Sequence, residues 1–160
     1  MNKTKRVYLA LVFLLIFHSV AFANSNTATK ILRVARGEIG KGETAANNCG
    51  RDVAKYLRTK DHLSWCAGFV SFVLSNADIK IKYTLRAKDF LSYGVKVLTP
   101  LPSDLVIFTR RGGGHVGIVE QVFKDYYISI EGNVGDFPAR VKRIKHSYNE
   151  KNFLCFRRKK

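Results

Sequence analysis

Hydrophobic positions recur at helical spacing in the first half of the chain and change to strand-like spacing in the second half. Before Gly94, apolar side chains lie three or four positions apart, and glycine or polar stretches end each pattern. This spacing predicts four helical segments, over residues 28–38, 51–58, 65–76 and 87–93. The first half of the chain is therefore expected to be helical.

After Gly94, apolar residues alternate with polar ones or form short continuous runs, which is typical of strands. Six segments have this character: residues 95–98, 104–109, 115–123, 126–131, 140–144 and 153–157. Helices followed by consecutive strands predict an α+β fold. We expect the helices to pack on an antiparallel sheet of about six strands.

The first 23 residues have the three parts of a secretory signal peptide. Cations at positions 3, 5 and 6 precede an apolar run over 7–17, and Ala21-Phe22-Ala23 is a small-x-small cleavage site. The run is too short to span a bilayer comfortably, and no later stretch approaches the ~20 apolar residues of a membrane helix. We expect cleavage near Ala23 and a protein that is secreted or periplasmic, without a transmembrane segment.

Residues 24–29 are predicted to be a disordered leader, and residues 30–160 a single domain, which is long enough to bury one core. The chain carries a formal charge of +16, and loss of the three cations in the signal peptide would leave +13. Such a field attracts polyanions. Because an exported protein rarely meets nucleic acid, we expect the basic surface to bind anionic envelope polymers, and we expect a monomer.

Cys66 is the candidate nucleophile, because it stands where Trp65 leads into an apolar, helix-length segment. Unpaired backbone N–H groups and the positive end of the helix dipole in the first turn favour the thiolate. His115 and Glu131 follow as a candidate base and an acid to orient it, and Asn133 as a further polar support. Cysteine, histidine and an acid in this order indicate a cysteine hydrolase.

The register of the hairpin formed by the third and fourth strands decides whether His115 and Glu131 share a face. A three-residue loop at 123–125 pairs Gly117 with Glu131 and directs both candidate side chains, with Asn133, to the same side. A two-residue loop at 124–125 would separate His115 from Glu131 unless a bulge intervened. We predict the three-residue loop.

The cleft around Cys66 is expected to be lined by four further residues, Trp65, Asn47, Asn48 and Gly114. The backbone N–H of Cys66 is the first candidate oxyanion donor, and the sequence leaves the second donor open. No cofactor is predicted, and Asp61, His62 and Cys66 lack the paired spacing of a structural zinc site. The basic stretch from Arg140 to His146 is by default a solvated face.

Simpler interpretations exist for the same residues. Cys66 alone could be a small core residue, since thiols are commonly buried. Three cysteines leave at least one unpaired, and a disulfide between Cys49 and Cys155 remains open. The combination of thiol, histidine and acid in one exported domain favours the catalytic interpretation.

The chain resembles the CHAP domain family, the cysteine- and histidine-dependent amidohydrolases and peptidases, over about residues 31–157. The motifs that carry the resemblance are Glu38-Ile39-Gly40, the segment 47–57, Trp65-Cys66-Ala67-Gly68-Phe69-Val70, the segment 102–108, Gly114-His115-Val116-Gly117-Ile118-Val119 and Glu131-Gly132-Asn133. The resemblance implies a papain-like fold and roles for Cys66, His115, Glu131 and Asn133 in catalysis. Some relatives carry a calcium-binding acidic loop, but the corresponding stretch here has only Glu43 and Asp52.

The resemblance also implies cleavage of peptidoglycan amide bonds, by an N-acetylmuramoyl-L-alanine amidase or by an endopeptidase of the stem peptides or cross-bridges. Two alternatives stay open. The protein could be a secreted cysteine-hydrolase toxin or effector, or a non-catalytic, basic module that binds the cell wall.

Overall fold

The computed structural model describes residues 26–110 and 112–160, so the predicted signal peptide lies outside the described residues. All four predicted helical segments are present. The first helix covers 26–37, and it is followed by α2 (Arg51–Leu57), α3 (Cys66–Asn76) and the 3₁₀ helix η1 (Ala87–Ser92).

The predicted disordered leader over 24–29 is wrong for its described part, because residues 26–29 are the first turn of the first helix. Ile31, Leu32 and Ala35 of this helix are buried in the core. Once they anchor it, extension by another turn adds a hydrogen bond for each residue fixed, without a new nucleation cost. Helix propagation therefore extends upstream into a polar segment.

All six predicted strands are present and form one antiparallel sheet in the order β1-β6-β2-β3-β4-β5. Their bounds are β1 (Val95–Val97), β2 (Leu105–Arg110), β3 (Gly113–Val122), β4 (Tyr126–Val134), β5 (Arg140–Ser147) and β6 (Phe153–Arg158). The fold is therefore α+β, as predicted, and is consistent with a papain-like description. No helix in the described ranges is long and apolar enough to cross a membrane.

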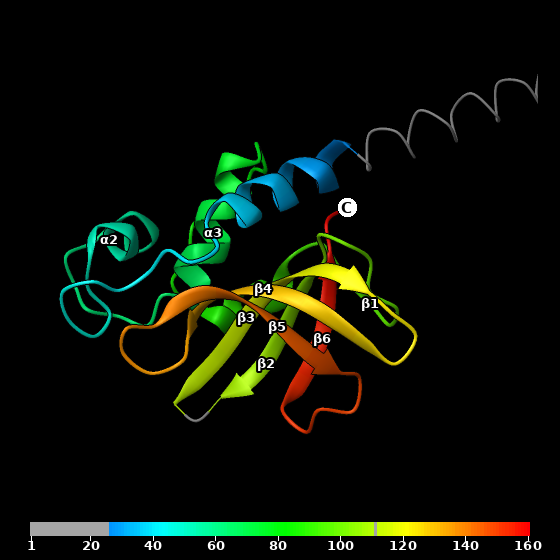
Figure 1. Ribbon diagram of the computed structural model, residues 1–160. Helices are drawn as coiled ribbons and strands as arrows, with labels where there is room; N and C mark the ends of the chain where they lie inside the picture. Colours follow the sequence, from blue (N-terminus) through cyan, green and yellow to red (C-terminus); the bar gives the residue numbers. More distant parts are fainter. Residues whose placement is uncertain (1–25, 111) are drawn as a thin grey trace, which may run out of the picture.

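The helices lie along one side of a curved sheet (Figure 1). In β2, β3, β4 and β6, residues on opposite faces of the strand belong to two different hydrophobic clusters. Val116, Ile118 and Ile130 belong to the main core with α3, whereas Val119 and Tyr127 belong to a smaller cluster with residues of β2 and β6. By this alternation, His115 and Glu131 belong to the sheet face that carries the smaller cluster.

The hairpin of β3 and β4 has a shorter loop than predicted. The N–H of Phe123 donates to the carbonyl of Tyr126 at 2.9 Å, which leaves a two-residue loop at 124–125. A register shift between Val119 and Gln121 then restores the predicted pairing of Gly117 with Glu131. The loop prediction is wrong, while the predicted register beside the candidate site is confirmed.

Glu120 is the extra residue at this β-bulge. Its buried carboxylate accepts hydrogen bonds from the guanidinium groups of Arg36, at 2.7 Å, and Arg143, at 2.6 Å. These partners come from the first helix and from β5. A bulge that shifts one strand by a residue is thus held by ion pairs to two other elements.

Candidate active site

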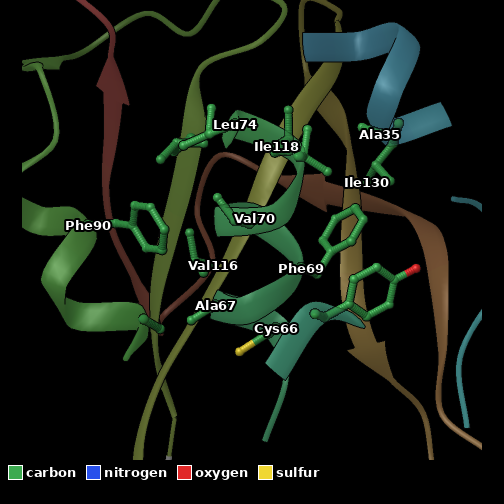
Figure 2. Close-up of a cluster of buried hydrophobic side chains, with 14 of the residues drawn as sticks. Ala35, Cys66, Ala67, Phe69, Val70, Leu74, Phe90, Val116, Ile118 and Ile130 are labelled. Atoms are coloured by element: carbon green, nitrogen blue, oxygen red, sulfur yellow. The ribbon is translucent and has the colours of Figure 1, made fainter. Parts of the chain in front are cut away.

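Cys66 is the first residue of α3, and Trp65 is its N-cap. Figure 2 shows the sulfur of Cys66 at the end of this helix, pointing out of the hydrophobic cluster. Burial acts to raise the pKa of the thiol, but His115 and the backbone N–H groups of Val116 and Ala67 outweigh burial and lower that pKa. The environment therefore favours a thiolate at the head of the helix.

His115 and Glu131 are brought together by β3 and β4. His115 Nε2 donates to Glu131 Oε2 at 2.7 Å, and both side chains are buried. Burial acts to lower the pKa of His115, but Cys66 and Glu131 outweigh it and raise this pKa to about 9. Burial likewise opposes ionisation of Glu131, whose pKa is nevertheless held far below its usual value by His115 and His146.

The other imidazole nitrogen of His115, Nδ1, is buried and forms no hydrogen bond within the described part of the chain. Because Nε2 is committed to Glu131, Nδ1 is the nitrogen that is available to the Cys66 thiol. The coupling between the Cys66 and His115 charges is mutual, since each moves the pKa of the other toward the ion pair. Thiolate and imidazolium therefore stabilise each other.

Gly117 gives the Glu131 side chain the room it needs. A Cβ at position 117 would lie 2.5 Å from Cγ and 3.2 Å from Oε1 of Glu131. The carboxylate thus lies directly across the neighbouring strand. This close approach explains why a glycine stands opposite the acid.

Asn133 does not take the predicted direction toward His115. Its Nδ2 donates to Ser64 Oγ at 3.3 Å, two residues before Cys66, and its backbone is left-handed with φ 60°. The β4–β5 register shifts between Glu131 and Val134, which breaks the alternation on which the prediction depended. Asn133 therefore contacts the segment that leads into α3.

Trp65 does not line an open cleft, because its side chain is fully buried. It stacks on Tyr56 with ring centroids 5.4 Å apart, and its Nε1 donates to Glu43 Oε1 at 3.2 Å. The predicted role in substrate binding is therefore wrong. The Trp65 indole instead anchors the N-terminal end of α3 in the core.

The other three predicted cleft residues are at least partly accessible. Asn47 is exposed, whereas Asn48 is half-buried and donates its backbone N–H to Glu43 Oε1 at 2.8 Å. Gly114 is half-buried, and a Cβ there would lie 3.2 Å from Cγ of Lys88. The structure thus places these residues on accessible segments and leaves their contact with substrate a prediction.

Two functional neighbours were missed in the sequence. Glu43 is fully buried and anchors both Trp65 and the loop that carries Asn48. His146 is buried on β5, within the stretch predicted to be a solvated face, and its Nε2 donates to Glu131 Oε1 at 2.7 Å. The prediction for residues 140–146 is wrong at this residue, because the His146 ring packs against Phe108 and Tyr127 of the smaller cluster instead of facing solvent.

The three cysteines Cys49, Cys66 and Cys155 are all unpaired in the structure. Cys155 is buried on β6, and Cys49 is half-buried in the loop before α2. The disulfide left open by the sequence is not formed. Cys66 is the cysteine that interacts with His115.

Residues 58–133 match the model of the CHAP domain. This segment is similar to a CHAP domain. The matched segment contains Cys66, His115, Glu131 and Asn133, which are the residues that the structure brings to the head of α3. A CHAP domain indicates a hydrolase of the peptidoglycan amidase or peptidase type, dependent on cysteine and histidine.

No curated protein matches the chain. His146 lies beyond the segment matched by the CHAP model, as does all of β5. The contact between His146 and Glu131 therefore joins the matched segment to the part of the chain that follows it.

Proposed function

We propose that the protein is an exported peptidoglycan hydrolase that cleaves amide bonds with Cys66 as nucleophile. The observation that carries this proposal is the position of Cys66 at the head of α3, where it interacts with His115, whose Nε2 is bound to Glu131. This arrangement supplies a thiolate, a proton donor and an anion that orients the donor. The match to the CHAP domain supports the substrate class.

In the first half-reaction, the Cys66 thiolate attacks the amide carbonyl carbon and forms a C–S bond. The backbone N–H of Cys66 donates to the developing oxyanion, aided by the positive end of α3. As the C–N bond breaks, the proton on His115 Nδ1 passes to the leaving amine. The product of this step is a thioester at Cys66, with neutral His115 still bound to Glu131.

In the second half-reaction, neutral His115 accepts a proton from water, and the hydroxide attacks the thioester carbon. The C–S bond breaks, the thiolate returns, and a carboxylic acid leaves. Glu131 stabilises the imidazolium at both stages through the 2.7 Å contact. Asn133, bound to Ser64, supports the segment that leads into α3.

Export is part of the proposal. Residues 1–23 have the pattern of a signal peptide, residues 30–160 form the catalytic domain, and cleavage near Ala23 would deliver it to the periplasm or the exterior. The net charge of +16, which cleavage of the three signal-peptide cations would reduce to +13, supports attraction to anionic envelope polymers. The bond cleaved is either the N-acetylmuramoyl-L-alanine amide or a peptide bond of the stems or cross-bridges.

The test is release of soluble fragments from purified, labelled sacculi, followed by mass analysis of the products. Cys66→Ala should abolish release, and Cys155→Ala, which removes another buried thiol, should retain it. Free stem peptides with intact glycan chains would identify an amidase, whereas broken cross-links or shortened stems would identify an endopeptidase. Equal release by Cys66→Ala and the parent, or no release by a folded parent that still binds sacculi, would contradict the proposal.

A further inference from the structure

Glu131 is bound by two histidines, and only one of them faces the nucleophile. His115 Nε2 lies 2.7 Å from Oε2, and His146 Nε2 lies 2.7 Å from Oε1. Ser129 Oγ also donates to Oε1, at 2.5 Å. The carboxylate is thus surrounded by donors, and it links the imidazole beside Cys66 to a second imidazole on β5.

The partners of His146 define its protonation state. Its Nδ1 lies 2.9 Å from Glu150 Oε1, so both ring nitrogens face carboxylate oxygens. An ionised carboxylate only accepts hydrogen bonds, and an imidazole that donates from both nitrogens is an imidazolium. The geometry therefore points to a buried cation between Glu131 and Glu150.

The surroundings of His146 contain no second cation among the described contacts. Phe108 and Tyr127 lie against its ring, with centroids 4.9 Å and 5.2 Å away. The titratable groups that face it are Glu131 and Tyr127 from β4 and Glu150 from the turn after β5. Tyr148 lies against Tyr127, and His115 lies on the far side of Glu131. Because aromatic rings exclude water, its charge acts strongly on Glu131.

We propose that His146 is a positioning residue of the hydrolase, which as an imidazolium holds the Glu131 carboxylate in place and offsets part of its charge. His146 thereby defines the pH range in which the Cys66 thiolate and the His115 imidazolium coexist. This inference depends on the proposed function for its catalytic meaning. It adds a residue from β5, beyond the segment that matches the CHAP domain.

The sign of the effect follows from charge alone. Replacing the His146 cation with a neutral side chain makes the potential at Cys66 and His115 more negative. A more negative potential opposes ionisation of the thiol and favours the imidazolium, so the pKa values of both groups rise. In the plot of kcat/KM against pH, the acidic limb and the basic limb should then both move to higher pH. A packing defect alone would lower kcat/KM without moving both limbs.

His146→Gln tests the proposal, with Lys145→Gln as the matched control. Lys145 is the exposed neighbour of His146 on β5, and its loss removes one positive charge on the solvent side. In His146→Gln we expect both limbs of the kcat/KM profile on labelled sacculi to rise by about one pH unit, which is about a tenfold change in thiolate fraction at fixed pH. In Lys145→Gln solvent screening should leave both limbs unchanged. A folded His146→Gln with unmoved limbs would overturn the proposal.

Two further measurements do not depend on the substrate. Alkylation of Cys66, followed against pH by peptide mass analysis, should titrate about one unit higher in His146→Gln even if peptidoglycan is not the substrate. Nitrogen-15 NMR of histidine-labelled parent protein near neutral pH should show protons on both nitrogens of the His146 ring. A neutral His146 ring would overturn the proposal, and this last result needs no variant to fold.

Discussion

Glu43 and Glu131 are two buried carboxylates that tie distant segments together with different kinds of partner. Glu43 accepts from the backbone N–H groups of Asn48 and Ala139, each at 2.8 Å, and from the indole of Trp65. Glu131 instead accepts from two imidazoles and a serine hydroxyl. Glu43 is held by donors that never lose their protons, whereas two of the three donors to Glu131 are imidazoles, which titrate.

The kind of hydrogen-bond donor distinguishes a carboxylate that anchors the fold from one that takes part in catalysis. Amide and indole N–H groups hold Glu43 in place. Glu43 in turn holds the loop before α2 and, through Trp65, the N-terminal end of α3. Imidazoles also hold Glu131 in place, but unlike amide and indole N–H groups they gain or lose a charge as they titrate. Burial of an acid therefore does not by itself identify a catalytic group, whereas the kind of donor around it does.

The largest expected effect is that of Glu131→Gln on turnover. The amide keeps the shape of the side chain but removes the anion that stabilises the His115 imidazolium, so kcat/KM should fall on the order of 10³-fold. Initial rates of fragment release from labelled sacculi measure this. A loss of less than about tenfold would place Glu131 with Glu43 as an anchor.

The matching substitution at the other carboxylate, Glu43→Gln, should lower the stability of the protein. An amide NH₂ would face at least one of the N–H donors that Glu43 now accepts, which should lower the free energy of unfolding by about 2 kcal/mol. Chemical denaturation of the purified variant measures this change. The pH limits of activity in the folded variant should match the parent, and shifted limits would show that Glu43 belongs with the titrating network.

The smallest effect is expected for Gly117→Ala. Its new Cβ would meet Cγ of Glu131, and the carboxylate must move by part of an ångström. We expect kcat/KM to fall by about tenfold, because the Glu131 carboxylate keeps its charge but is no longer aligned with His115. Gly37→Ala, at a position with no heavy atom near the added Cβ, is the matched control and should retain parental activity.

The elements of the fold followed from local periodicity, and Cys66 was recognisable as the first residue of a helix. His115 and Glu131 were found at predicted strand ends, although β3 begins before His115 and β4 continues past Glu131. The bulge at Glu120 could not be predicted, since its two arginine partners come from residues 84 positions before it and 23 positions after it. His146 was missed for a related reason. In a basic stretch it looks like another surface charge, and only the pairing of β5 with β4 brings it to Glu131.

The close packing of α3 on Gly132 limits which parts of the site can change during evolution. A Cβ there would lie 2.7 Å from Cβ of Phe69 and 2.9 Å from Cζ3 of Trp65, so α3 rests directly on the β4 backbone next to the acid. A larger residue at 132 would push the nucleophile away from its partners. Changes in substrate preference are therefore expected to accumulate in the accessible loop around Asn47, where the chain can vary without disturbing the distance between sulfur and imidazole.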